Sequence, residues 1–346
     1  MTRRKVILDT DPGVGIPGTD ADDPLALMLA LADPRVELVG VTTVFGNCPP
    51  DLGARGAAAV LRAAGRCDVP VAVGMARPLS GRLPAQLVDA YAGARGAPGR
   101  IPLPELGEAG RHAVDFLIDT VRANPGEVTV VAIGPQTNLA MALLKAPDLA
   151  ELIAEIVFMG GALGLDQQYG RGNITPVAEC NMWFDPHAAD IVFGSGVDLT
   201  MVSLDVTNPN KGVVLTDTLL RSVDRGASRL APLLLDICAT YMEAPMFDWA
   251  DHAGCVLYDP LAVAVAVAAP SPTSRRCRSA LRRAVNSPSG RPCPSAVKNR
   301  TSRSASTSTG RALSRTSSAP FSPPDISAPM RSSLPRRYGG TPGIRR

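Results

Sequence analysis

The sequence lacks the apolar segments that membrane and secreted proteins carry. Its longest apolar run, around residues 261–269, is far shorter than the roughly 20 residues that a membrane helix requires. The amino-terminal stretch MTRRKVILDTDPG has only Val6, Ile7 and Leu8 as an apolar run, which is too short for the core of a signal peptide. We therefore expect no membrane partner and a cytoplasmic location.

Cysteine pairs and histidine are also scarce. The chain has seven cysteines without a CxxC pair, and three histidines. The odd number of cysteines argues against a disulfide framework, and the lack of a CxxC pair argues against a zinc site. We expect buried free thiols, as in proteins of a reducing cytoplasm.

Charge is distributed unevenly along the chain. Residues 270–346 hold 16 of the 35 Lys and Arg but only one of the 32 Asp and Glu, which leaves 19 bases and 31 acids, a net charge of −12, in residues 1–269. The last 77 residues also contain 17 Ser and 11 Pro, with no apolar periodicity that could form a core. We therefore predict a folded domain at residues 4–269, incomplete at its carboxyl end, and a low-complexity tail at residues 270–346.

The tail has two interpretations. A basic arm binds nucleic acid through phosphate contacts, but this one has no RGG-like repeat and only Phe321 and Tyr338 to stack on bases. A shifted reading frame in GC-rich DNA also produces a segment dominated by Arg, Pro, Ser, Ala and Gly. We favour the shifted frame and expect no nucleic-acid partner; translating the other frames of the gene would decide between the two.

Short β-branched runs alternate with segments of helical period in residues 1–269. Strands are expected at residues 5–9, 36–44, 69–73, 128–133, 156–159 and 199–206. Helices are expected at residues 21–32, 52–64, 114–123, 138–145, 186–193, 215–223 and 230–242 and after Pro260. This alternation is typical of an α/β fold, a single domain with a mostly parallel, doubly wound sheet flanked by helices.

Ligands of such sheets bind beyond the carboxyl ends of the strands. The residues at or just after the expected strand ends are Asp9, Asp11, Asn47, Thr137, Gly160, Gly161 and Asp205. We expect the acidic and amide members of this set to converge on one crevice.

Carboxylates are concentrated in the segment DTDPGVGIPGTDADDPLAL. Asp9 and Asp11 leave the first strand on the same side, because the side-chain period of a strand is two. Asp20, Asp22 and Asp23 begin the first helix, where capping explains one of them. Carboxylates held close together repel one another unless a cation offsets the repulsion. With oxygen donors only, that cation should be hard, calcium first and magnesium second.

Eight motifs follow one another in residues 4–269. They are DTDPG, DDPLAL, TTVFGN, IGPQTNLA, FMGGA, GNITPVAECNMWFDP, LDVT and YDPLA. In this order and at these separations they resemble the nucleoside hydrolase family, the inosine-uridine-preferring nucleoside N-ribohydrolases. The resemblance implies hydrolysis of the N-glycosidic bond of ribonucleosides to free base and ribose in nucleoside salvage, with a bound calcium ion and a dimeric or tetrameric assembly.

The resemblance also implies roles for individual residues. Asp11 would be the base that activates a calcium-bound water. The calcium ligands would be the carboxylates of Asp11, Asp23 and Asp259 and the backbone carbonyl of Thr137, although Asp259 before Pro260 could also be a simple helix cap. The substrate would contact Asp22, Asn47, Met159, Asn173, Glu179 and Asn181.

The sequence departs from the family pattern in two places near these residues. Residues 14–21 separate DPG from DD, where the family usually has one residue, so that Asp20 could replace Asp22 or Asp23. Tyr258 stands where many members have a histidine that protonates the departing base, and both Tyr258 and His252 are therefore candidate catalytic residues. Tyr258, Tyr241 and Trp249 could instead stack on a purine, which leaves the base preference open.

Two other functions compete with this interpretation. The chain could be a catalytically impaired relative that binds ribose or nucleosides, because the usual histidines are replaced. It could also be a phosphatase of the haloacid-dehalogenase type, whose first strand ends in DxD. That site requires Thr or Val two residues after the second Asp, and Gly13 stands there.

Overall fold

The computed structural model describes residues 3–96, 99–107, 110–165, 172–209, 213–243 and 254–268. The strands are β1 (Arg4–Thr10), β2 (Val36–Thr43), β3 (Val71–Val73), β4 (Val128–Ala132), β5 (Glu155–Met159), β6 (Leu199–Val202), β7 (Val214–Thr216) and β8 (Gly254–Val256). The helices are α1 (Asp22–Ala32), α2 (Pro50–Ala64), α3 (Ala85–Gly96), α4 (Ala113–Ala123), α5 (Thr137–Lys145), α6 (Leu149–Leu152), α7 (Cys180–Phe184), α8 (Pro186–Gly194), α9 (Leu204–Thr207), α10 (Asp217–Ser222), α11 (Ala231–Glu243) and α12 (Tyr258–Val267). The tail predicted from residue 270 onward lies outside the described residues.

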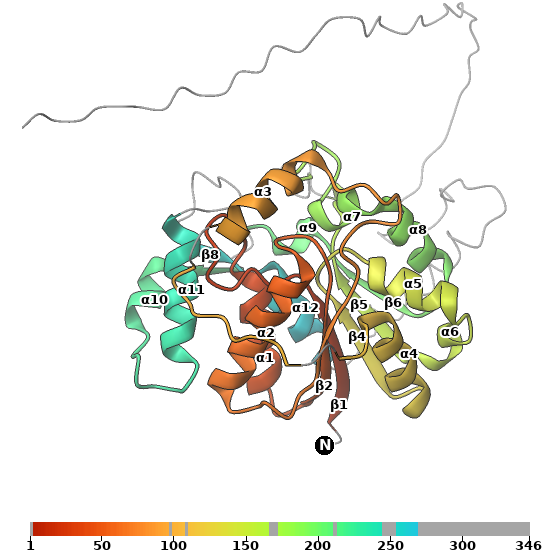
Figure 1. The fold of residues 1–346 in the computed structure, drawn as a ribbon, viewed down its shortest axis with the longest axis horizontal. Coiled ribbons are helices and arrows are strands. Elements are labelled where there is room, and N and C mark those ends of the chain that lie inside the picture. Colours follow the sequence, from red (N-terminus) through yellow and green to blue (C-terminus); the bar gives the residue numbers. More distant parts are fainter. Residues whose placement is uncertain are drawn as a thin grey trace, which may run out of the picture. The chain divides into compact units, whose positions relative to one another are not determined.

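β1 to β6 form one parallel sheet in the order β3-β2-β1-β4-β5-β6. β1 lies at the centre, and Leu8 pairs with Val41 of β2 on one side and with Val131 of β4 on the other. The strands run upward from the amino terminus in Figure 1, so that their carboxyl ends meet at one edge of the sheet. The predicted doubly wound parallel sheet is confirmed.

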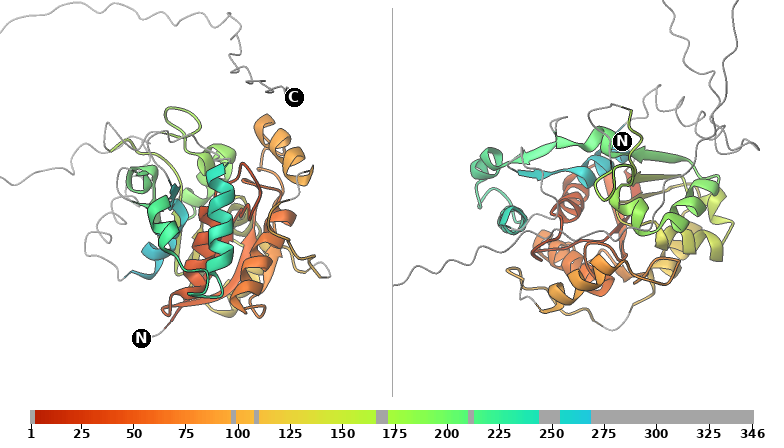
Figure 2. Two further views of the ribbon diagram at one scale, coloured as in Figure 1. Left: turned by 90° about the vertical axis from the view of Figure 1, so that its left-hand side faces the viewer. Right: turned by 90° about the horizontal axis from the view of Figure 1, so that it is seen from above.

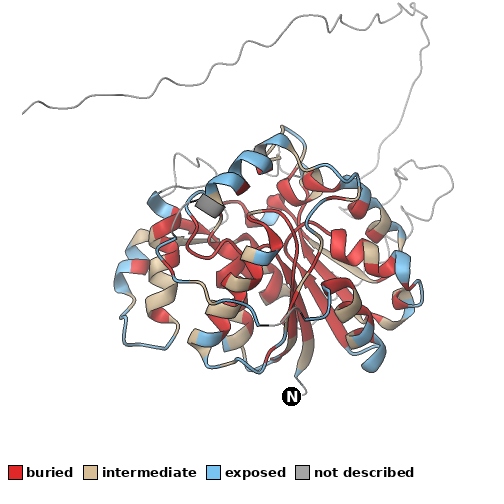
Figure 3. Ribbon diagram, viewed as in Figure 1, coloured by how far each residue is buried: buried red, intermediate tan, exposed pale blue. Residues whose placement is uncertain are grey.

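Helices cover both faces of the sheet because its strands are apolar on both faces. Val6 and Leu8 of β1 belong to an apolar cluster formed with α1, α2, α11 and α12. Ile7, between them, belongs to a second cluster formed with α4, α5 and α8. Figure 2 shows the helices on either side of the sheet, and Figure 3 shows the central strands as buried. No helix within the described residues is long and apolar enough to cross a bilayer.

The structure corrects two of the predicted boundaries. The sixth strand ends at Val202 rather than at residue 206, and residues 204–207 form α9. The predicted helix at 215–223 begins as β7, which pairs antiparallel with β8, and only its second part is helical, in α10. Thr216 sets that start, because its side chain accepts a hydrogen bond from the backbone N–H of Leu219 as an N-cap.

Candidate active site

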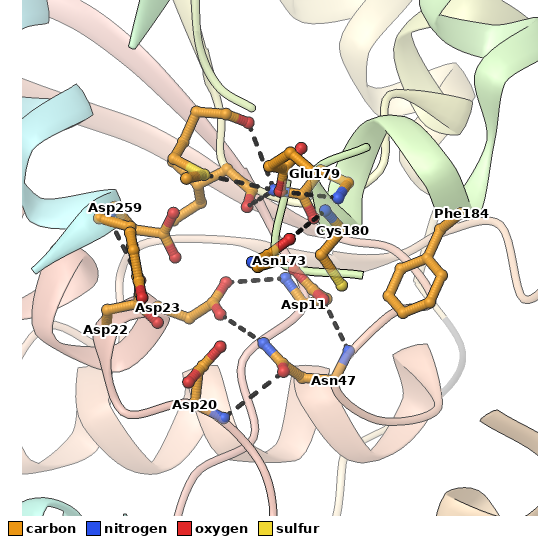
Figure 4. Close-up of a pocket in the computed structure, with 14 residues that line it drawn as sticks. Asp11, Asp20, Asp22, Asp23, Asn47, Asn173, Glu179, Cys180, Phe184 and Asp259 are labelled. Atoms are coloured by element: carbon orange, nitrogen blue, oxygen red, sulfur yellow. Dashed lines mark hydrogen bonds between the residues drawn. The ribbon is translucent and has the colours of Figure 1, made fainter. Parts of the chain in front are cut away.

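A pocket opens at the carboxyl ends of the strands, at the edge where doubly wound sheets bind ligands (Figure 4). Its walls come from the loops after β1, β2, β4 and β5 and from the starts of α1, α7 and α12. The lining residues are Asp11, Asp20, Asp22, Asp23, Asn47, Ile133, Met159, Asn173, Glu179, Cys180, Asn181, Phe184, Tyr258 and Asp259. Six of the fourteen are acids, and none carries a positive charge.

Asp11 is held directly beyond the end of β1. The backbone N–H of Asn47 donates a hydrogen bond of 2.7 Å to its Oδ2. A Cβ atom on Gly134 would stand 2.5 Å from its Oδ1, and a Cβ atom on Gly46 would overlap its Oδ2. Glycines after β2 and β4 therefore leave the space in which the Asp11 carboxylate lies.

Asp23 is fixed by three donors from outside its own helix. The hydroxyl of Thr10 and the backbone N–H of Asp11 donate to its Oδ1, the second at 3.1 Å. Nδ2 of Asn47 donates to its Oδ2 at 2.8 Å. The first turn of α1 is thus tied to the ends of β1 and β2.

Asp259 reaches the same place from the far end of the folded chain. Its backbone N–H donates a hydrogen bond of 3.3 Å to Oδ2 of Asp22. The N-cap residues of α1 and α12 are Ala21 and Leu257, and neither helix has a side-chain cap. Asp22, Asp23 and Asp259 are therefore not the N-caps of their own helices, although Asp22 accepts a hydrogen bond from the first turn of α12.

Asp22, Asp23 and Asp259 each present a ligand oxygen, and these oxygens lie within 4.8 Å of one another. All three side chains are buried, and their donors are oxygen only, which suits a hard divalent cation such as calcium or magnesium. The residues present therefore fit the metal that the resemblance implies. Asp11 lines the same pocket outside this group of three, and Asp22, which the resemblance assigns to the sugar, lies within it.

Burial and mutual repulsion shift the ionisation of these carboxyl groups. Burial raises the pKa of Asp11 well above its usual value, and the charge of Asp23 raises it further. Burial and the charges of neighbouring acids also raise the pKa values of Asp22 and Asp259. A bound cation reverses this effect, because it favours the charged carboxylates.

Glu179 forms the opposite wall of the pocket as the N-cap of α7. Its carboxylate is 2% exposed and accepts hydrogen bonds from the backbone N–H groups of Gly161, Asn181 and Met182. Nδ2 of Asn181 donates to the carbonyl oxygens of Ile133 and Met159, which turns its Oδ1 away from them. The amide oxygen of Asn173 accepts from the backbone N–H of Cys180, which leaves its Nδ2 as the free end. These contacts fix three polar groups at one end of the pocket.

The other sequence candidates fall in different places. Tyr258 lines the pocket and is buried, whereas His252 and Trp249 lie outside the described residues. Thr137 is buried at the start of α5, where its hydroxyl donates to Asp185 at 2.7 Å, and its side chain is not part of the pocket lining.

The expectation that Asp9 and Asp205 join the crevice is wrong. Asp9 lies inside β1, and its Oδ1 accepts hydrogen bonds from Thr42 and Asn138 within the core. Asp205 lies in α9, and its carboxylate binds the backbone N–H groups of Leu163 and Leu165. Both acids satisfy buried or loop N–H and hydroxyl donors instead of facing a ligand.

Sequence reasoning missed three apolar or thiol residues of the lining, Ile133, Cys180 and Phe184. Cys180 and Phe184 belong to the motif GNITPVAECNMWFDP, which also contains Glu179 and Asn181. The signal was therefore present, since residues on both sides of a polar candidate in one short helix can face the same cavity.

Comparisons with known proteins agree with this geometry. The family profile described as inosine-uridine preferring nucleoside hydrolase matches residues 6–313. Probable uridine nucleosidase 2 of Oryza sativa is 39% identical over 75% of this chain and 73% of its own length. Pyrimidine-specific ribonucleoside hydrolase RihA of Shewanella is 37% identical over 75% of this chain and 77% of its own.

Solved structures show the same relationship. A purine-preferring ribonucleoside hydrolase from Gardnerella vaginalis superimposes with a TM-score of 0.66 at 35% identity, covering 76% of this chain and 80% of its own. The plant nucleoside hydrolase PpNRh1 does so with a TM-score of 0.64 at 32% identity, covering 76% and 78%. By its sequence, its fold and the order of its motifs, this chain belongs to the family of inosine-uridine preferring nucleoside hydrolases.

Proposed function

We propose that this chain hydrolyses the N-glycosidic bond of ribonucleosides, with calcium held by the pocket carboxylates and Asp11 as the general base. The observation that carries the proposal is the cluster of five aspartates and Glu179 around one pocket that no Lys or Arg lines. Family membership supports the reaction class and leaves the phosphatase alternative without support.

Asp11 is the best-placed base in the pocket. One of its oxygens is held by the backbone N–H of Asn47, and Gly46 and Gly134 leave the space that the carboxylate occupies. A general base must be ionised at the working pH and within hydrogen-bond reach of the proton that it takes. Since burial raises the pKa of Asp11, the base requires a nearby positive charge to remain ionised.

Asp22, Asp23 and Asp259 would hold the calcium ion, together with Asp11 and the backbone carbonyl of Thr137, the further ligands that the resemblance implies. A calcium ion bound there supplies positive charge that makes a nearby water a better nucleophile at neutral pH. The remaining acceptors, on Asn47, Asn181 and Glu179, would bind the sugar.

The acidic walls suit the charge that develops on the sugar. Cleavage of a glycosidic bond passes through an oxocarbenium-like transition state, in which the sugar becomes positively charged. Carboxylates fixed by backbone N–H groups, as Glu179 is, are preorganised to stabilise that charge. The pocket thus favours the transition state over a neutral nucleoside.

The departing base needs a proton or a hydrogen bond. Tyr258 is the described candidate, because it lines the pocket directly before Asp259. Related enzymes are named for uridine, pyrimidine or purine substrates, and we leave the base preference of this chain to measurement. Tyr258→Phe should lower kcat more than it changes KM.

A nucleoside panel tests the proposal. We expect the chain to release free ribose from at least one of uridine, inosine and adenosine when calcium is present, and to stop when a chelator is added. Asp11→Asn should lower kcat by roughly 1,000-fold or more, as loss of a central catalytic group does. Asp115→Asn is a matched control, because Asp115 is partly exposed, forms an ion pair with Lys145 and does not line the pocket. Retained nucleoside binding without turnover by the wild-type chain would instead identify an impaired binding relative.

The cysteines fit the proposed location in a reducing cytoplasm. Within the described residues, Cys180, Cys238 and Cys255 are buried free thiols as expected, whereas Cys67 is exposed, which corrects the expectation for that residue. Free thiols persist where glutathione and thioredoxin keep them reduced.

A further inference from the structure

The loop between β1 and α1 is a folded element that ends in the pocket. Val14 and Ile16 are 1% and 6% exposed, and a Cβ atom on Gly56 of α2 would lie 2.8 Å from the Val14 side chain. The hydroxyl of Thr19 donates to the carbonyl oxygens of Gly13 and Ile16 at 2.7 and 2.8 Å. The extra residues of this loop are therefore packed against the domain.

Asp20, at the end of this loop, is set against Asn47. Its backbone N–H donates a hydrogen bond of 3.5 Å to Oδ1 of Asn47, whose Nδ2 donates to Asp23. Figure 4 shows the Asp20 carboxylate beside those of Asp22 and Asp23, facing the same cavity. The loop thus brings one more carboxylate to the pocket.

Asp20 differs from the other acids of the pocket in its contacts. Asp11, Asp22, Asp23 and Glu179 each accept a hydrogen bond from the protein. Asp259 belongs to the group of three that can hold a metal, and Asp20 does not. Within the described part of the chain, no protein group donates a hydrogen bond to either carboxylate oxygen of Asp20. A carboxylate acceptor in a binding pocket gains most when a ligand donates to it.

We propose that Asp20 is a specificity residue, whose carboxylate accepts a hydrogen bond from a ribose hydroxyl of the bound nucleoside. The inference rests on the proposed function, and it assigns a substrate contact to the loop in which this chain departs from its family. Ribose hydroxyls are the donors that every ribonucleoside offers, whatever its base. The folded loop restricts Asp20 before the substrate arrives, which reduces the entropy lost on binding.

Deoxynucleosides test this contact without any assumption about the base. Steady-state kcat and KM are measured for wild type and Asp20→Ala on a ribonucleoside that the wild type cleaves and on its 2′-, 3′- and 5′-deoxy analogues. Asp20→Ala should lower kcat/KM on the ribonucleoside by roughly 10- to 100-fold, the usual effect of losing a hydrogen bond to a charged group. On the one analogue that lacks the bound hydroxyl, the kcat/KM values of wild type and Asp20→Ala should agree within about threefold. Asp20→Asn keeps an acceptor oxygen and should recover part of the loss.

Measurements of calcium affinity and nucleoside binding distinguish a failure of the Asp20 assignment from a failure of the proposed function. Calcium affinity, measured by calorimetry, should change less than about threefold in Asp20→Ala, whereas loss of a metal ligand costs about tenfold or more. A tenfold loss of calcium affinity, an equal loss of kcat/KM on all four substrates, or no loss on any would overturn the assignment. If the wild type releases no ribose, the proposed function fails, and the same comparison of ribo- and deoxynucleosides is made on binding constants, where the same selective loss is expected.

Discussion

Asn47 contacts three of the acids that line the pocket. Its backbone N–H binds Asp11, its Nδ2 binds Asp23, and its Oδ1 accepts from the backbone of Asp20. Three acids from two separate segments are therefore held by one amide residue after β2. An amide serves here because it offers both a donor and an acceptor without adding charge.

Asp9 gives the clearest pH dependence in the core. Burial raises its pKa from 3.8 to about 6, although hydrogen bonds from Asn138 and Thr42 oppose the shift. The folded protein therefore binds a proton at Asp9 more tightly than the unfolded chain does. The contribution of Asp9 to the free energy of unfolding falls as the pH rises from about 4 to about 6, and it stays constant at higher pH.

Asp9→Asn should therefore stabilise the protein at high pH. We expect a gain of about 3 kcal/mol in the free energy of unfolding at pH 8, which shrinks towards zero as the pH falls to about 4. Urea unfolding of both proteins at a series of pH values measures the difference. A difference that does not change with pH would show that the Asp9 carboxylate carries no such penalty.

Several site residues could be identified from the sequence, because their motifs place them at strand ends or helix starts. Asp11, Asp22, Asp23, Asn47 and Glu179 were predicted to act in one site, and the structure brings them to one pocket. Asp9 shares the motif DTD with Asp11 yet lies in the core. The alternation of side chains along a strand predicted that Asp9 and Asp11 point to the same side. Because β1 ends at Thr10, this alternation does not extend to Asp11.

Two glycines, Gly46 after β2 and Gly134 after β4, lie against the carboxylate of Asp11. Gly134→Ala places a methyl group 2.5 Å from Asp11 Oδ1 and 2.8 Å from the Val44 side chain, so that the carboxylate must move. We expect nucleoside hydrolysis to fall by roughly 100-fold, as after a displacement of about 1 Å at a catalytic group. The fold should persist, since the methyl group meets side chains only.

Gly93→Ala is the matched control for this substitution. Gly93 lies within α3 with open space around its Cα, so the added methyl group meets nothing. Activity should be unchanged, and stability should rise by up to about 1 kcal/mol, because alanine favours the helix. Equal rates for Gly134→Ala and wild type would show that Gly134 is not required to position the Asp11 carboxylate.

Element boundaries were harder to predict than the elements themselves. The run LTMVSLDV contains β-branched residues typical of a strand, but its last three residues belong to α9. Tertiary contacts decide this, since the backbone N–H of Leu204 bonds to Gly161 and the Asp205 side chain binds the loop after β5. Such contacts join segments about 40 residues apart, and a local pattern does not contain them.

The total net charge of +3 hides two regions of opposite charge. Residues 1–269 have a net charge of −12, and part of that charge surrounds the pocket. The family profile extends to residue 313, beyond the point where the sequence changes in composition. The boundary at residue 270 and the shifted frame stay predictions.

Removal of calcium should destabilise the folded domain, because Asp22, Asp23 and Asp259 then repel one another. Calcium at a hundredfold excess over its Kd should contribute about 2.7 kcal/mol, which corresponds to a rise in Tm of a few degrees. Thermal unfolding in calcium and in chelator measures the shift. Asp259→Asn should reduce it and Asp115→Asn should keep it; a wild-type Tm that is the same in both buffers would contradict a metal at this site.

A calcium titration tests whether these carboxylates form a calcium-dependent hydrolytic site. Metal-free protein is titrated with calcium while free ribose released from uridine and inosine is measured, with bound calcium followed by calorimetry. We predict that the rate rises with bound calcium and saturates at one ion per chain. Full activity in chelator, or no ribose from either nucleoside once calcium is bound, would show that the pocket is not a calcium-dependent hydrolytic site.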